Sequence, residues 1–326
     1  MEYKTPVEVY FIGNINQNLN EALFFTGFFM ENSPCFFSRD GKKQLAYAEF
    51  GDPHGYPIIF AHGAPGCHVE GALFDTEAKN YGFRFIVLDR PGMGSSDFNP
   101  AQTLLAYPLD VKALADHLGL KRFGVMGWSG GGAPTMACGY AIADLIDFCI
   151  VLAGYTPLDT PELLALLPKA DQFGYRLLNK PWLFNSMFWL MQWMVQWTPG
   201  RYYALIKKAV NESDLALLMD PVTQQRFMLD QIHCFKKGYQ GTAMDARLTY
   251  QPWNYDIRAM MTRIDIFHGT DDKLVPFAFA ERNASLIPNC HLHPLPKQGH
   301  LFPFSHQQLI FDQAKACEQL SKARST

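Results

Sequence analysis

The chain has 326 residues, of which 48% are apolar and 14% aromatic, so it can bury a large core and is neither disordered nor fibrous. Its 28 basic and 31 acidic residues give a net charge of -3 without a long run of either sign, which argues against a nucleic-acid partner. Seven scattered cysteines lack disulfide or metal-ligand spacing and predict reduced, mostly buried thiols in a cytoplasmic protein.

Residues 1–35 are predicted to be an N-terminal extension. The apolar run at 22–30 follows a stretch with several acidic residues and no cleavage site, so a secretory signal is not expected. At nine residues the run is too short to span a bilayer. We expect a helix or strand that packs on the domain, with surface attachment or a lid over the site as alternatives.

From residue 36 the chain alternates short β-rich runs with helical stretches. This alternation predicts an α/β fold with a mostly parallel, twisted sheet and flanking helices. A helix is predicted at 104–118, closed by Gly119. Seven strands are predicted, at 45–50, 58–61, 83–88, 123–126, 148–152, 264–267 and 291–295.

Residues 156–257 interrupt this alternation. The stretch lacks strand patterns and holds five of the six tryptophans, which predicts an inserted helical cap between core segments 36–155 and 258–326. Trp189, Trp193 and Trp197 repeat every four residues and so share one helical face. That stripe is expected to pack the cap onto the core or to line an apolar pocket. Trp128, Trp189 and Trp193 are the candidate substrate-binding residues.

The strongest local motif is the G-x-S-x-G run from Gly127 to Gly131. It stands directly between a predicted strand and a predicted helix. A sharp strand-to-helix turn strains the serine backbone, which is why glycines flank it, and it leaves the hydroxyl exposed beside a helix N-terminus that can stabilise an oxyanion. This context predicts Ser129 as a nucleophile.

Two further glycine-rich turns follow predicted strands. The first runs from His62 to Gly66, where Ala64 can supply a backbone N–H beside that of Gly130 to form an oxyanion hole; His62 is expected to hold the loop. The second starts at Asp89-Arg90 and lacks the lysine and spacing of a phosphate loop, so its charged residues are expected to brace the site.

A nucleophilic serine needs a base, and the base needs an orienting acid. His300 follows the last predicted strand and a loop, whereas the histidines at 268, 291 and 293 lie within or beside strands. The strand at 264–267 is followed by two adjacent carboxylates, Asp271 and Asp272, and either one can serve as the acid.

Taken together, the turns at 62–66, 89–94 and 127–131, the segment 268–276 and Gly299-His300 resemble the α/β-hydrolase superfamily. The five motifs occur in the expected order over roughly residues 36 to 320. In such proteins the acid usually stands four residues before the proline of the D-x-x-V-P stretch, which selects Asp272 over Asp271. The resemblance implies a Ser129-His300-Asp272 triad and no metal or organic cofactor.

The same motifs help to distinguish among the subclasses of this superfamily. An aspartate at the elbow would indicate epoxide hydrolases or dehalogenases, and the GWSGG and DRPG turns depart from the usual pattern of proline iminopeptidases. Cofactor-free haloperoxidases and carbon–carbon bond hydrolases stay open. The main prediction is a serine hydrolase that acts on an uncharged, apolar, ester-like small molecule.

Two rival classes keep the same fold. One is a ligand receptor that retained the triad without turnover. The other is a membrane-associated hydrolase, because the run 183–197 is apolar around much of its circumference and is flanked by Lys180 and Arg201. Four polar residues count against spanning, namely Asn185, Ser186, Gln192 and Gln196. The oligomeric state is left open.

Overall fold

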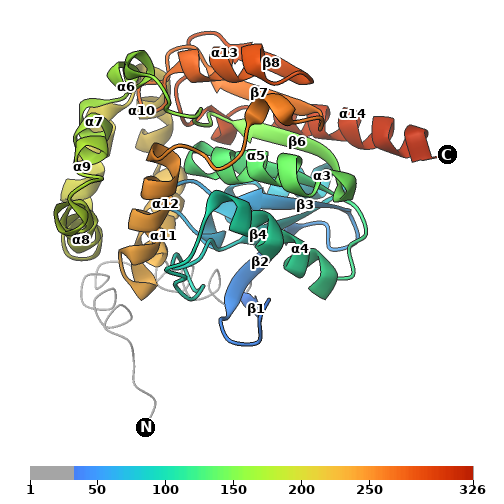
Figure 1. Ribbon diagram of the computed structural model, residues 1–326, viewed down its shortest axis with the longest axis horizontal. Coiled ribbons are helices and arrows are strands. Elements are labelled where there is room, and N and C mark those ends of the chain that lie inside the picture. The colour runs from blue at the N-terminus through green and yellow to red at the C-terminus, as the bar shows by residue number, and fades with distance from the viewer. Residues whose placement is uncertain (1–32, 326) are drawn as a thin grey trace.

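The computed structural model describes residues 33–325 (Figure 1). The apolar run at 22–30 and most of the predicted N-terminal extension lie outside the described residues, so the expectations for them stay predictions.

A single eight-stranded sheet runs through the described part of the chain, in the order β1-β2-β4-β3-β5-β6-β7-β8 (Figure 1). β1 and β2 pair antiparallel, as do β2 and β4, and every other neighbouring pair is parallel. The strands are β1 (Cys35–Phe37), β2 (Leu45–Gly51), β3 (Tyr56–Ala61), β4 (Phe83–Leu88), β5 (Phe123–Trp128), β6 (Ile146–Leu152), β7 (Ile264–Gly269) and β8 (Cys290–Leu295). The predicted mostly parallel sheet is confirmed, and all seven predicted strands are present.

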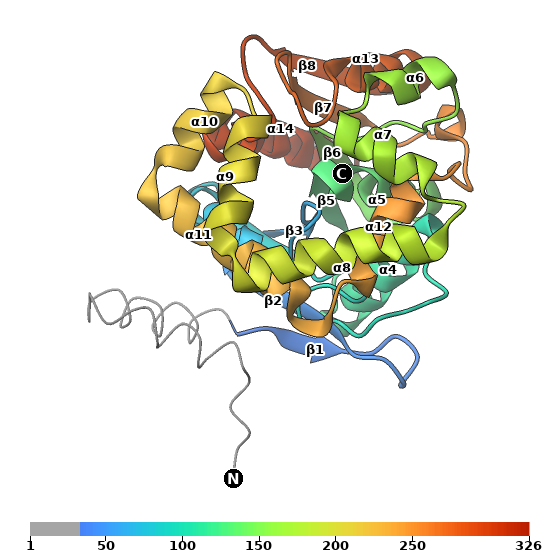
Figure 2. The same ribbon diagram turned by 90° about the vertical axis from the view of Figure 1, so that its left-hand side faces the viewer.

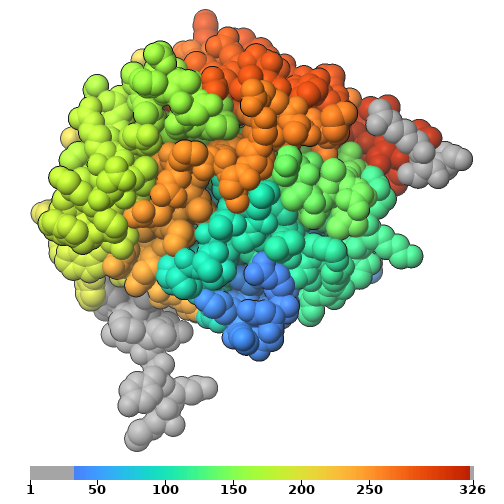
Figure 3. All heavy atoms as spheres, viewed as in Figure 1, coloured from blue at the N-terminus to red at the C-terminus, as the bar shows by residue number. Residues whose placement is uncertain are grey.

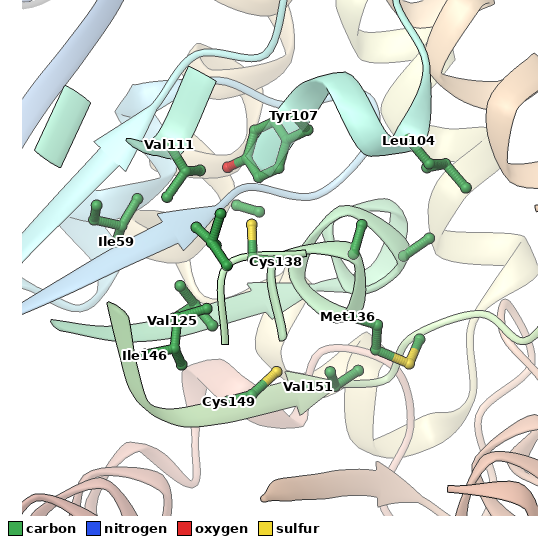
Figure 4. Packing of buried hydrophobic residues seen from close by; sticks show 14 of the residues in the cluster. Ile59, Leu104, Tyr107, Val111, Val125, Met136, Cys138, Ile146, Cys149 and Val151 are labelled. Atoms are coloured by element: carbon green, nitrogen blue, oxygen red, sulfur yellow. The ribbon is translucent and has the colours of Figure 1, made fainter. Parts of the chain in front are cut away.

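Helices cover both faces of this sheet because alternate side chains of each strand point to opposite faces. In β3, Ile59 joins the core cluster under α4 and α5, whereas Ile58 and Phe60 join the cluster that includes side chains of α3 and α14. Figure 4 shows the first cluster, with Val111 and Cys138 between helix and sheet. The flanking helices are α3 (Asp75–Asn80), α4 (Tyr107–His117), α5 (Gly132–Ala141), α13 (Phe277–Leu286) and α14 (Gln307–Ser325).

Between β6 and β7, a stretch that the structure describes in full, the chain forms helices and no strand. We call these seven helices the cap helices; four of them begin with a proline, a residue suited to the first helical turn. They stand together beyond one end of the sheet (Figures 1 and 2). The cap helices are α6 (Pro161–Leu166), α7 (Lys169–Arg176), α8 (Pro181–Trp197), α9 (Pro199–Ala209), α10 (Glu212–Met219), α11 (Pro221–Cys234) and α12 (Gln240–Tyr250).

Candidate active site

The turn between β5 and α5 has the backbone geometry of a nucleophile elbow. Ser129, directly after the last residue of β5, has a positive φ of 55°, a conformation that is costly for a residue other than glycine. The motif glycines are required by close packing. A Cβ on Gly127 would lie 2.1 Å from Thr135 Oγ1, and one on Gly131 would lie 2.1 Å from the Ala61 carbonyl oxygen. These contacts fix the turn that presents Ser129 at the end of β5.

Asp272 and His300 meet beyond the carboxyl ends of β7 and β8. The Nδ1 atom of His300 lies 2.7 Å from Oδ2 of Asp272. The other oxygen, Oδ1, accepts the backbone N–H groups of Leu274 and Val275 at 2.8 and 2.9 Å. Asp271 is exposed and accepts a hydrogen bond from the hydroxyl of its neighbour Thr270. Of the two adjacent carboxylates, the geometry therefore joins Asp272 to the histidine.

The charges of this pair follow from its surroundings. Burial raises the pKa of Asp272, but the charge of His300 and hydrogen bonds from His268 and His300 outweigh burial and hold it well below its usual range. Burial lowers the pKa of His300, and the charges of Asp272, Asp214 and Asp171 reverse the shift, so that its pKa is raised. Because ionised Asp272 can only accept, Nδ1 of His300 donates and Nε2 is left for the reacting group.

The loop at 62–66 lies against the elbow. A Cβ on Gly130 would be 2.7 Å from the Cβ of Ala64 and 3.5 Å from its backbone nitrogen, so the two predicted oxyanion donors belong to adjoining residues. His62 is fully buried; its Nδ1 lies 2.8 Å from the Gly63 carbonyl oxygen and its Nε2 accepts the Arg90 N–H. Burial and the Arg90 charge lower the pKa of His62 well below its usual value, which matches a neutral ring that holds the loop.

The Asp89-Arg90 turn braces the same loop, as predicted. The guanidinium of Arg90 donates to the carbonyl oxygens of His62 and Gly63 and forms two bonds to Asp245 of α12, at 2.8 and 2.9 Å. Asp245 carries the negative charge that compensates this buried cation. Arg90 thus ties the loop of the core to a cap helix.

Two buried carboxyl groups accept backbone N–H groups of the loop at 62–66 and of the residue that follows it. Glu70 Oε2 accepts the Gly63 N–H, and Asp230 of α11 accepts the Cys67 N–H. A Cβ on Gly66 would lie 3.1 Å from Glu70 Oε2 and 3.2 Å from Asp230 Oδ2, so both carboxyls face this glycine. Burial raises the pKa of Glu70 well above its usual value and that of Asp230 to about 7, and each is raised further by a neighbouring negative charge. Both carboxyl groups therefore keep their protons to a higher pH than an ordinary carboxyl does.

The cap also forms hydrogen bonds to the loop that carries His300, which we call the histidine loop. Asp214 of α10 accepts the backbone N–H groups of His300 and Leu301 at 2.7 and 2.8 Å. The adjacent Ser213 hydroxyl accepts the Gly299 N–H at 3.0 Å. Sequence reasoning missed this role, because a carboxylate that accepts N–H groups 86 and 87 residues away has no local motif. Asp171 of α7, half-buried and bonded to the Tyr250 hydroxyl, was also missed.

The three candidate substrate-binding tryptophans have different surroundings. Trp128 is buried beside His300: its indole N–H donates to the His300 carbonyl oxygen and its ring packs on that imidazole. Trp189 and Trp193 are 55% and 45% exposed. They lie on the face of α8 opposite to the buried side chains of Phe184 and Phe188. This exposure contradicts the expectation that Trp189 and Trp193 pack the cap onto the core, and their role as substrate-binding residues stays a prediction.

One cluster among the described residues has the composition of a metal site. Side-chain atoms of Cys67, His68 and Asp89 lie within 4.8 Å of one another. However, Asp89 already accepts from the backbone and the ring of His68 and from the Ser95 N–H. Burial raises the pKa of Cys67 well above its usual value, which keeps a neutral thiol. We interpret the cluster as a hydrogen-bonded brace of the loop.

Comparison with known proteins identifies the class. The sequence model described as "Alpha/beta hydrolase family" matches residues 58–313, so the chain belongs to this family. Among solved structures, a thermophilic esterase from Thermogutta terrifontis has a TM-score of 0.65 at 20% identity and covers 89% of this chain and 98% of its own. The enol-lactonase from Burkholderia xenovorans LB400 has a TM-score of 0.66 at 15% identity, over 87% of this chain and all of its own.

Sequence relatives point to a hydrolase without agreeing on one reaction. A proline iminopeptidase from Xanthomonas citri is 34% identical, but only over 110 residues, 31% of this chain and 33% of the relative's length. A non-heme chloroperoxidase from Streptomyces lividans is 23% identical over 82% of this chain and 92% of its own. The predicted fold and family are thus confirmed, and hydrolase is the activity that the relatives support.

Proposed function

We propose that the protein is a serine hydrolase that cleaves ester-like bonds of small to medium apolar molecules through an acyl-enzyme on Ser129. The observation that carries this proposal is the strained elbow at Ser129, with its φ of 55°, in a chain whose Asp272 and His300 form a 2.7 Å contact beyond the same sheet edge. The proposed mechanism uses only side chains and backbone groups of this chain.

The mechanism follows from the roles of these groups. His300 takes the proton of Ser129 as the hydroxyl oxygen attacks the substrate carbonyl, and the ionised Asp272 stabilises the imidazolium that forms. The Ala64 and Gly130 N–H groups bind the oxyanion. His300 then protonates the leaving group, and it later removes a proton from the water that cleaves the acyl-enzyme.

The apolar preference rests on the inner side of the cap helices. Phe184, Phe188 and Leu163 are buried with Val275 of the segment that follows Asp272, and Met187 and Met191 pack against them. Adaptable apolar groups beside a polar catalytic centre favour uncharged acyl chains. Since each buried methylene contributes up to about 0.8 kcal/mol, kcat/KM is expected to rise from acetyl to butyryl or hexanoyl esters, by about tenfold or more where two methylenes are buried.

The test combines covalent labelling with turnover. A fluorophosphonate probe is expected to label the wild type at one site, and Ser129→Ala is expected to abolish labelling and to lower turnover of p-nitrophenyl esters by about 10⁶ while it stays folded. Labelling without turnover of any ester would favour the receptor, and a folded Ser129→Ala protein with near wild-type turnover would refute the mechanism. A flat series from acetate to octanoate would contradict the apolar acyl pocket.

Asp171 favours a second candidate, an aminopeptidase. Its half-buried carboxyl lies on cap helix α7 and acts electrostatically on His300, so a substrate ammonium group held there would sit near the catalytic centre. The chain is locally similar to proline iminopeptidases. Proline p-nitroanilide therefore belongs in the substrate panel, and faster turnover of it than of every ester, lost in Asp171→Asn, would select this candidate.

A further inference from the structure

The outer face of α8 is an exposed aromatic surface. We call Trp182, Trp189 and Trp193 the tryptophan face; their side chains are 72%, 55% and 45% exposed. At 100° per residue they point within about 40° of one direction, opposite to the buried Phe184 and Val195. Leu190 of α8 is also exposed, at 50%, and so is Phe173 of α7, the preceding cap helix in the sequence, at 56%. An apolar patch of this kind marks an interaction site.

The segment of the chain that contains the tryptophan face has an excess of basic residues. Residues 169–208 contain six basic residues and one acidic residue, Asp171, although the whole chain carries an acidic surplus. Asp171 is half-buried and bonded to Tyr250. None of the ion pairs found within residues 33–325 involves one of the six cations, which are Lys169, Arg176, Lys180, Arg201, Lys207 and Lys208.

We propose that the cap docks on the surface of an anionic phospholipid membrane, with α8 parallel to the bilayer and the tryptophan face in the headgroup region. Indole rings favour the membrane–water interface because they combine an apolar body with an N–H donor. Lys180 and Arg201 flank the helix and can reach lipid phosphates along their apolar stems. The described helices include none long and apolar enough to cross a membrane, so the contact is peripheral.

Membrane docking through the tryptophan face is compatible with a catalytically active protein and with an inactive one. The reason is that this face lies opposite to the side of α8 that packs on the rest of the molecule. The inference therefore stands apart from the proposed function. It can be tested on protein that has lost turnover through Ser129→Ala as well as on the wild type.

The test is flotation of the full chain with vesicles of phosphatidylcholine alone or mixed with phosphatidylserine, together with tryptophan fluorescence. The wild type is expected to float with the anionic vesicles, to show a blue-shifted emission, and to bind less at high salt. Trp182→Ala/Trp189→Ala/Trp193→Ala is expected to weaken binding by about tenfold or more. Replacing Lys180 and Arg201 by Gln is expected to weaken binding to the vesicles that contain phosphatidylserine, by about fivefold for each charge removed. Binding to vesicles of phosphatidylcholine alone is expected to stay unchanged.

The matched control is Phe36→Ala/Leu109→Ala, which removes side chains that are 50% and 52% exposed but lie on the core. Circular dichroism and Tm verify that each variant is folded.

No vesicle binding by the wild type, or unchanged binding by the triple variant, would overturn the proposal. A lipid-free dimer that the triple variant converts to a monomer would assign the face to a second copy instead. Binding that depends on Phe24, Phe25, Phe28 and Phe29 but not on the tryptophan face would assign it to the run at 22–30.

Discussion

Two groups of buried carboxyls contact different loops of the candidate site, and their pKa values are shifted in opposite directions. Asp272, on the histidine side, receives two backbone N–H groups and the His300 ring. Glu70, on the oxyanion-loop side, receives the Gly63 N–H at one oxygen, and its other oxygen, Oε1, has no partner among the described residues. The pKa of Asp272 is lowered, whereas those of Glu70 and Asp230 are raised.

Burial acts in the same direction on all three groups, so it does not decide their charge. Asp230 accepts two N–H groups, as Asp272 does from the backbone, so the number of donors does not decide it either. The sign of the neighbouring charges does: His300 lies beside Asp272, whereas negative groups lie beside Glu70 and Asp230. An ionised acid is useful beside an imidazole that becomes cationic. A second anion beside the oxyanion loop would oppose the charge that develops there, and the protonated Glu70 and Asp230 avoid this repulsion.

Among substitutions of these carboxyl groups, the largest expected effect comes from neutralising Asp272. Asp272→Asn is expected to lower ester turnover by about 10⁴, because an amide in place of the carboxylate disturbs the tautomer of His300 and removes the charge that stabilises its imidazolium. The measurement is kcat/KM for a p-nitrophenyl ester across pH, with folding verified by Tm.

Asp271→Asn is the matched control for that change. Its carboxyl is exposed and bonded to Thr270, so turnover is expected to stay within about twofold of the wild type. If Asp271→Asn were the more damaging of the two, the acid would be misassigned.

Substitution of Asp214 is expected to have an effect of intermediate size. Its carboxyl accepts two backbone N–H groups from the loop that carries His300, but no hydrogen bond joins it to the His300 imidazole. In Asp214→Asn the amide nitrogen cannot accept, so one backbone N–H of the histidine loop loses its partner at a cost of about 1–3 kcal/mol. Turnover is expected to fall by about tenfold. The charge of Asp214 also raises the pKa of His300, and the base works when neutral, so the acid limb of the pH–rate profile is expected to move to lower pH. An unchanged limb would leave Asp214 with a purely structural role.

The fold was largely predictable because its signals are local. Buried runs such as 148–152 and the punctuation by glycines locate the parallel strands without long-range information. The exception is β1, which has three residues, pairs only with β2 and exposes Phe36, so it has no buried run to reveal it. Helical spacing showed that Trp189 and Trp193 share a face, but Phe184 and Phe188 have the same spacing on the opposite face. Periodicity gives a shared face and not its direction.

The candidate site also contains residues that local sequence signals revealed and residues that they did not. Ser129 and its glycines were identifiable because the elbow strains its own backbone and requires a short motif. Asp214 and Asp230 were not, because each is a cap carboxyl that accepts an N–H from a distant core loop, and any acidic residue of the cap could have held that place. Such contacts are created by how the cap docks, which the sequence pattern does not encode.

The smallest expected effect comes from the oxyanion-loop side, where Glu70→Gln and Asp230→Asn replace protonated carboxyls by neutral groups of the same size. Ester turnover at pH 6 is expected to stay within about fivefold of the wild type, because no charge is lost, in contrast to Asp272→Asn. A loss near 10³ in either variant would mean that a carboxylate is needed there and would break the contrast between the two sides.

The raised pKa values of Glu70 and Asp230 are expected to affect the pH dependence of the free energy of unfolding rather than turnover. The folded protein holds protons on Glu70 and Asp230 that the unfolded chain releases above the ordinary pKa values of 4.5 and 3.8, so their contribution to stability is complete below those values. As pH rises, the contribution of Asp230 is lost through its folded-state pKa of about 7, and that of Glu70 is lost as pH rises through its own raised pKa. One such group changes the free energy of unfolding by at most about 1.4 kcal/mol per pH unit, or about 2 kcal/mol between pH 5 and 7. Thermal melts of the wild type and the Glu70→Gln/Asp230→Asn variant across this range measure it. The wild type is expected to lose a few degrees more of Tm than the double variant, while Asp271→Asn follows the wild type. Parallel slopes for the wild type and the double variant would show that these carboxyls are ionised in the folded protein at neutral pH.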